Sequence, residues 1–199
     1  MRVFAFDHRL QLEQMEGYSP DRGSRFKELC LKAALQVQAG RPGYGILCDN
    51  RIGRRALHAA SGTGLWIGRP CEWPGSRPLE FEPELGLDCG GLEEWPRDNV
   101  VKVLCYCHPD DDAEMRRLQE ENVKRLFQAS RRNGLEFLLE IIPSKVGAVD
   151  DTTTAVLIER FYAAGIFPDW WKLEPLKTET AWSNAVAAIK SNDRHTRGI

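Results

Sequence analysis

The sequence has little that would point to nucleic acid, a membrane or a metal ion. Lys and Arg number 27 against 29 Asp and Glu, so there is no basic excess for a nucleic-acid partner. No apolar run approaches membrane-spanning length, and the first residues do not form a signal peptide. The chain has four histidines, and none pairs with another at the spacing of metal ligands. These absences predict a soluble cytoplasmic protein without a nucleic-acid or membrane partner.

Two further motifs are missing. None of the six cysteines is in a CxxC pair, which argues against a zinc site, so we expect all six to be reduced and structural. The short Gly62-Thr-Gly64 segment is too weak a signal for a phosphate-binding turn. The sequence thus predicts neither a metal nor another cofactor.

What the sequence does contain is a regular alternation of strand and helix patterns. Apolar runs predict six strands, and they lie at 3–6, 45–49, 65–68, 99–107, 137–142 and 168–175. Helices are expected between them, which is typical of a parallel sheet built from repeated βα units. The 199 residues suffice for one domain, and we predict a TIM-type (β/α)8 barrel, with an open doubly wound sheet as the alternative.

Two helices carry specific expectations. In the helix predicted over 24–38, Phe26, Leu29, Cys30, Ala33 and Ala34 share one face, which we expect to be the buried face. A later helix is expected to begin at a capping box formed by Asp111 and Glu114. The segment from 70 to about 97 is rich in Pro and Gly and is predicted to be a long loop, typical of a functional segment or a lid.

Three strands each carry a lone charged residue. Strand alternation places Lys102 with Leu104 and Tyr106 on one face, and Glu140 and Lys172 interrupt two other apolar strands. A lysine is rarely placed in a buried strand unless its charge is paired or its amine is used. A neutral amine can attack a ketone to form a Schiff base. Lys172 is therefore a candidate nucleophile, and a buried ion network that only holds the fold together is the alternative.

Several strings resemble a known family in order along the chain. Ala5-Phe-Asp-His-Arg9, Gly45-Ile-Leu-Cys-Asp49, Val100-Val-Lys-Val-Leu-Cys-Tyr106, Leu138-Leu-Glu-Ile141 and Trp171-Lys-Leu-Glu174 resemble the class I aldolase group that includes tagatose-1,6-bisphosphate aldolase. Longer strings are closer to one aldolase-like domain of that group: Trp66-Ile-Gly-Arg-Pro70, His108-Pro-Asp-Asp111 and Pro168-Asp-Trp-Trp-Lys-Leu-Glu-Pro175. That domain is often fused to a ribokinase-type sugar kinase in inositol catabolism and is associated with 5-dehydro-2-deoxyphosphogluconate aldolase activity.

The resemblance implies roles for individual residues. It places the Schiff-base lysine at Lys172, a second active-site lysine at Lys102 and a proton-transferring glutamate at Glu140. It places a strand-one aspartate that binds substrate hydroxyls at Asp7. Arg9 or Arg69 is our candidate for holding the substrate carboxylate. The implied reaction is cleavage of a ketose-like sugar phosphate without a metal.

The chain is shorter than such a barrel, which takes about 250 residues. The seventh strand barely begins at Arg197-Gly-Ile199. We expect either a truncated barrel or a sheet that another chain completes, and open strand edges would favour a homo-oligomer.

Two other function classes stay open. One is a metal-dependent isomerase or class II aldolase on the same barrel. The other is a non-catalytic barrel that binds sugar phosphates or partners a sugar kinase domain.

Overall fold

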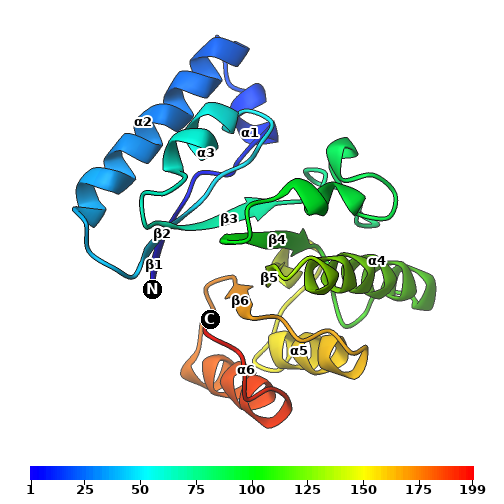
Figure 1. Ribbon diagram of the computed structural model, residues 1–199. Helices are drawn as coiled ribbons and strands as arrows, with labels where there is room; N and C mark the ends of the chain where they lie inside the picture. Colours follow the sequence, from blue (N-terminus) through cyan, green and yellow to red (C-terminus); the bar gives the residue numbers. More distant parts are fainter. The chain divides into compact units, whose positions relative to one another are not determined.

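The computed structural model describes residues 1–199 and has an α/β fold (Figure 1). Hydrogen bonding joins six strands in one sheet in the order of the chain, β1-β2-β3-β4-β5-β6. The strands are β1 (Arg2–Ala5), β2 (Tyr44–Leu47), β3 (Trp66–Pro70), β4 (Asn99–Cys105), β5 (Glu136–Ile141) and β6 (Trp170–Leu173). The β1–β2, β2–β3 and β5–β6 pairs are parallel. This confirms the prediction of a parallel α/β fold.

Helices connect the strands. They are α1 (Leu10–Glu13), α2 (Pro20–Gln38), α3 (Arg54–Ala60), α4 (Ala113–Arg132), α5 (Thr153–Ala163) and α6 (Glu179–Asn192), with three short 3-10 turns at Pro83–Leu85, Gly90–Glu94 and Pro143–Lys145. The contacts divide the chain into two compact units, one of residues 1–70 and 96–101 and the other of residues 71–95 and 102–199. The prediction of one barrel domain stays a prediction, and the units are described in turn.

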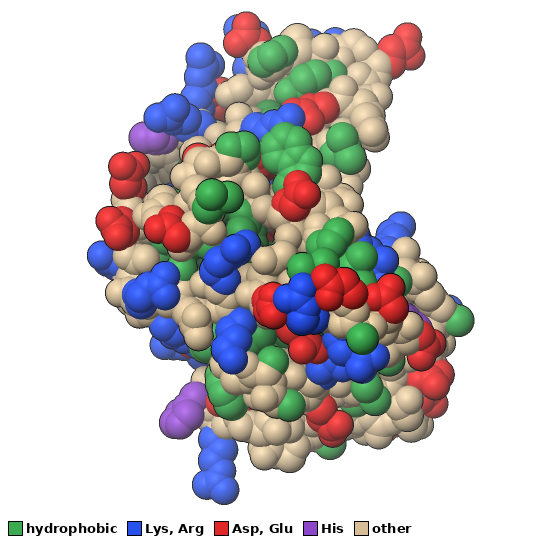
Figure 2. Space-filling view, turned by 90° about the vertical axis from the view of Figure 1, so that its right-hand side faces the viewer, with side chains coloured by type: hydrophobic (Ala, Val, Ile, Leu, Met, Phe, Trp, Pro, Cys, Tyr) green, Lys and Arg blue, Asp and Glu red, His purple; other side chains and the backbone are tan.

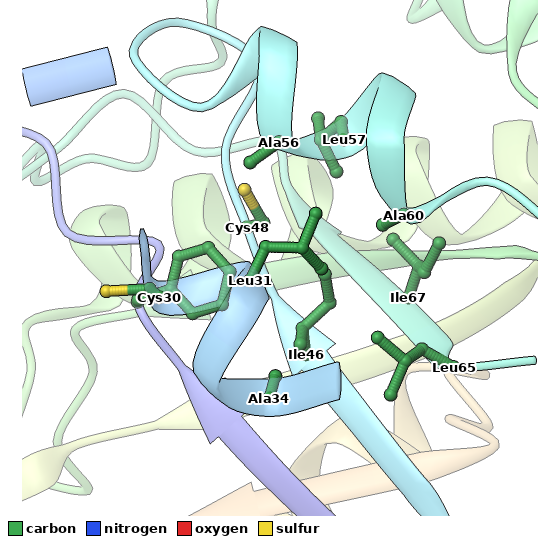
Figure 3. Close-up of a cluster of buried hydrophobic side chains, with 11 residues drawn as sticks. Cys30, Leu31, Ala34, Ile46, Cys48, Ala56, Leu57, Ala60, Leu65 and Ile67 are labelled. Atoms are coloured by element: carbon green, nitrogen blue, oxygen red, sulfur yellow. The ribbon is translucent and has the colours of Figure 1, made fainter. Parts of the chain in front are cut away.

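The first unit holds β1, β2 and β3 with the helices α1, α2 and α3. Its core is a cluster of small and branched side chains from α2, α3, β2 and β3, including Leu31, Ile46, Ala56 and Ile67 (Figure 3). On the opposite face of the sheet, Gly68 of β3 is the register partner of Leu47 in β2, and a Cβ there would lie 2.4 Å from Cδ2 of Leu47.

Helix α2 corrects one prediction. The residues buried along it are Gly23, Lys27, Cys30, Leu31, Ala34 and Gln38. Phe26 and Leu29, which we expected to be buried, are 48% and 63% exposed. The helix has two apolar stripes about 100° apart, and the sequence pattern alone could not tell which one faces the sheet.

The second unit holds most of β4 together with β5, β6, α4, α5 and α6. Asp112 is the N-cap of α4, and its side chain accepts a hydrogen bond from the Met115 N–H, so the predicted cap at Asp111 was wrong by one residue. Asp111 instead accepts a hydrogen bond from the His108 N–H. Gly165 follows the end of α5 with φ +80°, a left-handed conformation that is common for glycine at helix ends.

The 71–95 segment is an ordered connection, with a strand-like bridge between Glu72 and Phe81 as well as two 3-10 turns. Gln119 on α4 holds it, since its amide oxygen accepts from the Leu79 N–H at 2.7 Å. The amide nitrogen of Asn122 donates to the Leu79 carbonyl at 2.8 Å. As predicted, the 71–95 segment contains no long helix or strand. Its backbone is nevertheless held in place by side chains of α4.

The last residues lie beside β6. Gly198 forms an isolated parallel bridge with Trp170, and the Trp171 N–H donates to the Gly198 carbonyl at 3.0 Å. This pairing agrees with the predicted start of a further strand, whereas truncation of the barrel stays a prediction.

The surface shows acidic and basic side chains interspersed on one face (Figure 2). Along α4, Arg117 forms ion pairs with both Glu114 and Glu121. None of the helices combines the length and apolar character needed to cross a membrane.

Candidate functional site

Two of the predicted residues lie side by side because of the register of the sheet. In the parallel pair of β5 and β6, Glu140 is the partner of Lys172. Lys172 Nζ donates to Glu140 Oε1 at 2.5 Å. Neighbouring residues in register point to the same face, so the two side chains meet as an ion pair.

Lys102 on β4 joins the same group. Its Nζ lies 2.9 Å from Glu140 Oε2 and 3.1 Å from Glu72 Oε1. The structure therefore brings together Lys102, Glu140 and Lys172, as the sequence predicted, and adds Glu72 in the chain Glu72–Lys102–Glu140–Lys172. The four charges balance, so the cluster is neutral overall.

Sequence reasoning missed Glu72, which is buried after the end of β3. Its second carboxylate oxygen accepts from the Leu104 N–H at 3.0 Å, which fixes the carboxylate against β4. A single glutamate in a Pro- and Gly-rich loop carries no periodic signal. The lysine in the strand predicted at 99–107 was the one clue, because a buried lysine needs a carboxylate partner.

Burial separates the two lysines. Lys102 is 3% exposed and enclosed by two carboxylates, whereas the side chain of Lys172 is 36% exposed. The prediction that Lys172 lies in a buried strand was therefore wrong for the lysine itself. The prediction of a buried strand is correct for the neighbouring Trp171, which is 2% exposed. Lys172 is the amine of the cluster that a dissolved molecule can reach.

Trp171 shows how β6 presents Lys172. Its indole packs edge-on against Tyr162 of α5, with ring centroids 5.7 Å apart, and its Nε1 donates to the Tyr162 hydroxyl at 2.9 Å. Alternation along the strand then directs Lys172 to the face opposite α5. Trp171 thus anchors β6 on α5, while the next residue, Lys172, presents its amine on the opposite face of the strand.

The charges around Glu140 decide its ionisation. Burial by itself would raise the pKa of Glu140, but the ammonium groups of Lys102 and Lys172 outweigh burial and lower the pKa below its ordinary value of 4.5. Glu140 is therefore ionised at neutral pH and accepts hydrogen bonds from both lysines.

This shift predicts a pH dependence of stability. A carboxylate whose pKa is lower in the folded protein adds stability above its unfolded pKa, near 4.5, and that stability is lost as pH falls through the folded value. We expect the difference in free energy of unfolding between wild type and Glu140→Gln to be largest above pH 5 and to shrink below pH 4.5. Urea unfolding at several pH values would measure it. The exposed Glu93→Gln is the control, and an equal pH effect there would contradict the assignment.

Tyr106 is a neighbour to which the sequence assigned no role. Burial, and then the negative charge of Glu140, raises the pKa of its phenol. The hydroxyl is therefore protonated at neutral pH and can donate a hydrogen bond.

The other predicted residues belong to the first unit. Asp7 and Arg9 follow β1 and are 7% and 4% exposed, and Arg69 lies in β3. Their proposed contacts with substrate stay predictions.

A second buried lysine holds the segment that contains Asp7. Lys27 of α2 is fully buried, and its Nζ donates to Asp49 Oδ1 at 2.5 Å and to the His8 carbonyl at 2.8 Å, as well as to the Phe6 carbonyl. Asp49 also accepts from the Ile52 N–H at 2.6 Å. Lys27 thus ties the residues on either side of Asp7 to the end of β2, a role that the sequence analysis overlooked.

The structure contains no group of three or more His, Cys, Asp and Glu side chains that could hold a metal ion. All six cysteines are free and buried. The nitrogen Nδ1 of His108 accepts from the Asp110 N–H, and its Nε2 lies 2.8 Å from the Ala148 carbonyl, so both ring atoms have partners in loops.

Comparison with known proteins gives a family for the chain and a solved structure with a similar fold. A model of uncharacterized proteins conserved in bacteria, DUF2090, matches residues 1–199. The chain belongs to the DUF2090 family. No curated protein matches it. Among solved structures, fructose-bisphosphate aldolase from Plasmodium falciparum, in a complex with TRAP and a small-molecule inhibitor, superposes with a TM-score of 0.59. The match has 11% sequence identity and covers 96% of this chain and 67% of the aldolase.

At this identity the likeness concerns the fold, which is that of an aldolase. It agrees with the aldolase-like fold that the sequence motifs implied. The narrower resemblance to the inositol-catabolism domain does not follow from it.

Proposed function

We propose that this chain is a class I aldolase that uses Lys172 to form a Schiff base. One observation carries the proposal: the partly exposed Lys172 is held at 2.5 Å by the buried Glu140, which the buried Lys102 also contacts. The aldolase-like fold supports it, because the solved structure that shares this fold is a fructose-bisphosphate aldolase.

The first step needs a neutral amine. Glu140 accepts the Lys172 proton through their hydrogen bond, and the free amine attacks the substrate ketone. The resulting carbinolamine takes the proton back on its oxygen and loses water, which leaves an iminium ion. The positive charge of Lys102 keeps the Glu140 carboxylate ionised before the reaction begins. Glu140 can therefore accept the proton of Lys172.

The second step breaks the C–C bond. A base removes the proton from the hydroxyl β to the iminium carbon, the bond between the α and β carbons breaks, and its electron pair moves into the iminium to give an enamine. The β carbon leaves as an aldehyde. Protonation of the enamine and addition of water then release the second product and restore Lys172. Glu140 is our candidate for the proton transfers, with Lys102 holding a substrate oxygen.

The substrate that we propose is 6-phospho-5-dehydro-2-deoxygluconate, which cleaves to dihydroxyacetone phosphate and malonate semialdehyde. The motif resemblance supports this choice. Asp7 would bind substrate hydroxyls, and Arg9 or Arg69 would hold the carboxylate that distinguishes this compound from a neutral sugar phosphate.

The test is to trap the imine. The protein is incubated with dihydroxyacetone phosphate, borohydride is added, and the modified lysine is located by peptide mass spectrometry. We expect a single reduced adduct on Lys172, and exposed lysines such as Lys32 and Lys190 serve as internal controls. An adduct on Lys102 would reverse the roles of the two lysines. No adduct from folded protein would contradict the proposal and leave a structural ion cluster.

A further inference from the structure

Helix α2 presents an apolar stripe away from the core of its unit. Phe26, Leu29 and Val37 are 48%, 63% and 58% exposed. With the exposed Ala33 they follow the spacing i, i+3, i+7, i+11, which is one face of a helix. An amphipathic pattern of this length is the mark of a face that is normally covered.

Strand β1 continues the same surface. It is the end strand of the sheet, so one of its edges has no neighbouring strand. Val3 and Phe4 on it are 39% and 46% exposed. A groove of about 400 Å³ runs between β1 and the C-terminal half of α2 and is lined by Val3, Phe4, Ala33 and Val37 among others. We call the residues Val3, Phe4, Phe26, Leu29, Ala33 and Val37 the β1–α2 face.

We propose that this face binds a second copy of the same chain in a two-fold symmetric dimer. The reason is that the face is self-complementary. If two α2 helices pack antiparallel with their Ala33 residues at the axis, Leu29 of each copy meets Val37 of the other, because the two positions lie four residues on either side of Ala33. The small Ala33 side chain lets the helices approach closely at the crossing point.

Strand β1 is compatible with the same two-fold symmetry. An antiparallel pairing of the two β1 edges places Val3 opposite Phe4 of the second copy and Phe4 opposite Val3. The groove already brings β1 beside Ala33 and Val37, so one axis can pass through both pairings. Edge pairing would satisfy the open N–H and C=O groups of β1, which otherwise invite uncontrolled association.

The size of the face also suits a dimer. Five side chains with these exposed fractions present roughly 450 Å² between them, more than half of the roughly 800 Å² per partner of a standard interface. Two charged side chains stand at the margin of the face: Arg2 also lines the groove, and the exposed Lys32 lies beside Leu29 and Ala33 on α2.

The first experiment is sedimentation equilibrium on wild type, Leu29→Glu and Leu87→Glu. Leu29 is exposed within its own chain, so the substitution leaves the fold of one copy intact, which circular dichroism would verify. We expect a wild-type dimer and a dissociation constant raised at least about 100-fold by Leu29→Glu, since the dimer would bury two charges. Leu87 is 92% exposed and outside the face, so Leu87→Glu should dimerise like wild type. A monomeric wild type, or equal effects of both variants, would overturn the proposal.

A second experiment tests the axis. The six native cysteines are buried, so a new exposed cysteine would react alone. Under mild oxidation Ala33→Cys should form a disulfide-linked dimer far faster than Leu87→Cys. A dimer whose two cysteine variants cross-link at equal rates would overturn the arrangement proposed here.

Discussion

Replacing Lys172 by methionine is expected to abolish both imine trapping and aldol cleavage. Loss of a catalytic nucleophile lowers kcat by at least about 10⁴-fold, because no other group can take over the covalent step. In this chain the only other amine of the cluster is Lys102, which is 3% exposed and held between Glu72 and Glu140. Steady-state assays with the proposed substrate, together with borohydride trapping, would measure the loss.

Lys172→Arg separates catalysis from a structural ion pair. Its guanidinium keeps the positive charge beside Glu140 but is not a nucleophile at neutral pH. We expect the arginine variant to unfold at nearly the same urea concentration as wild type and yet to be as inactive as Lys172→Met. Retained activity in Lys172→Arg would show that only the charge matters, which would contradict the Schiff-base mechanism.

The largest expected effect on stability concerns Lys27. Its ammonium group and the Asp49 carboxylate are 0% and 1% exposed, so Lys27→Met leaves a buried carboxylate without its cation. Removing one partner of a buried ion pair costs about 3–5 kcal/mol. The free energy of unfolding, measured by urea titration, should fall by that amount.

The control for Lys27 lies on the same helix. Lys32 is exposed, so Lys32→Met should change stability by no more than about 0.5 kcal/mol. Replacing both partners, as in Lys27→Met with Asp49→Leu, should recover part of the loss because no unpaired charge remains. If Lys27→Met behaved like Lys32→Met, the ion pair would not be a stabilising element of the first unit.

The predictions that succeeded came from strong periodic patterns. The apolar runs identified all six strands, with ends displaced by at most two residues, since strand limits depend on pairing that the pattern does not contain. Lys102, Glu140 and Lys172 were recognised because each interrupts an apolar strand. Their convergence followed from the parallel sheet, in which residues in register stand side by side.

The predictions that failed concern positions where several local solutions compete. Asp111 and Asp112 are both good helix caps, and the helix begins at the second because the first binds the backbone of His108 and pairs with Arg77. Glu72 was missed since its role depends on a contact with a residue 30 positions away.

The sequence by itself determined the class of fold, the order of its elements and the three charged strand residues, because hydrophobic periodicity is a local property of the chain. The tertiary structure alone decided which stripe of α2 is buried, that Lys102 has two carboxylate partners and that Lys172 stays accessible. These outcomes depend on distances between segments remote in the chain. Burial and charge pairing act across such distances, and no pattern within a single segment contains them.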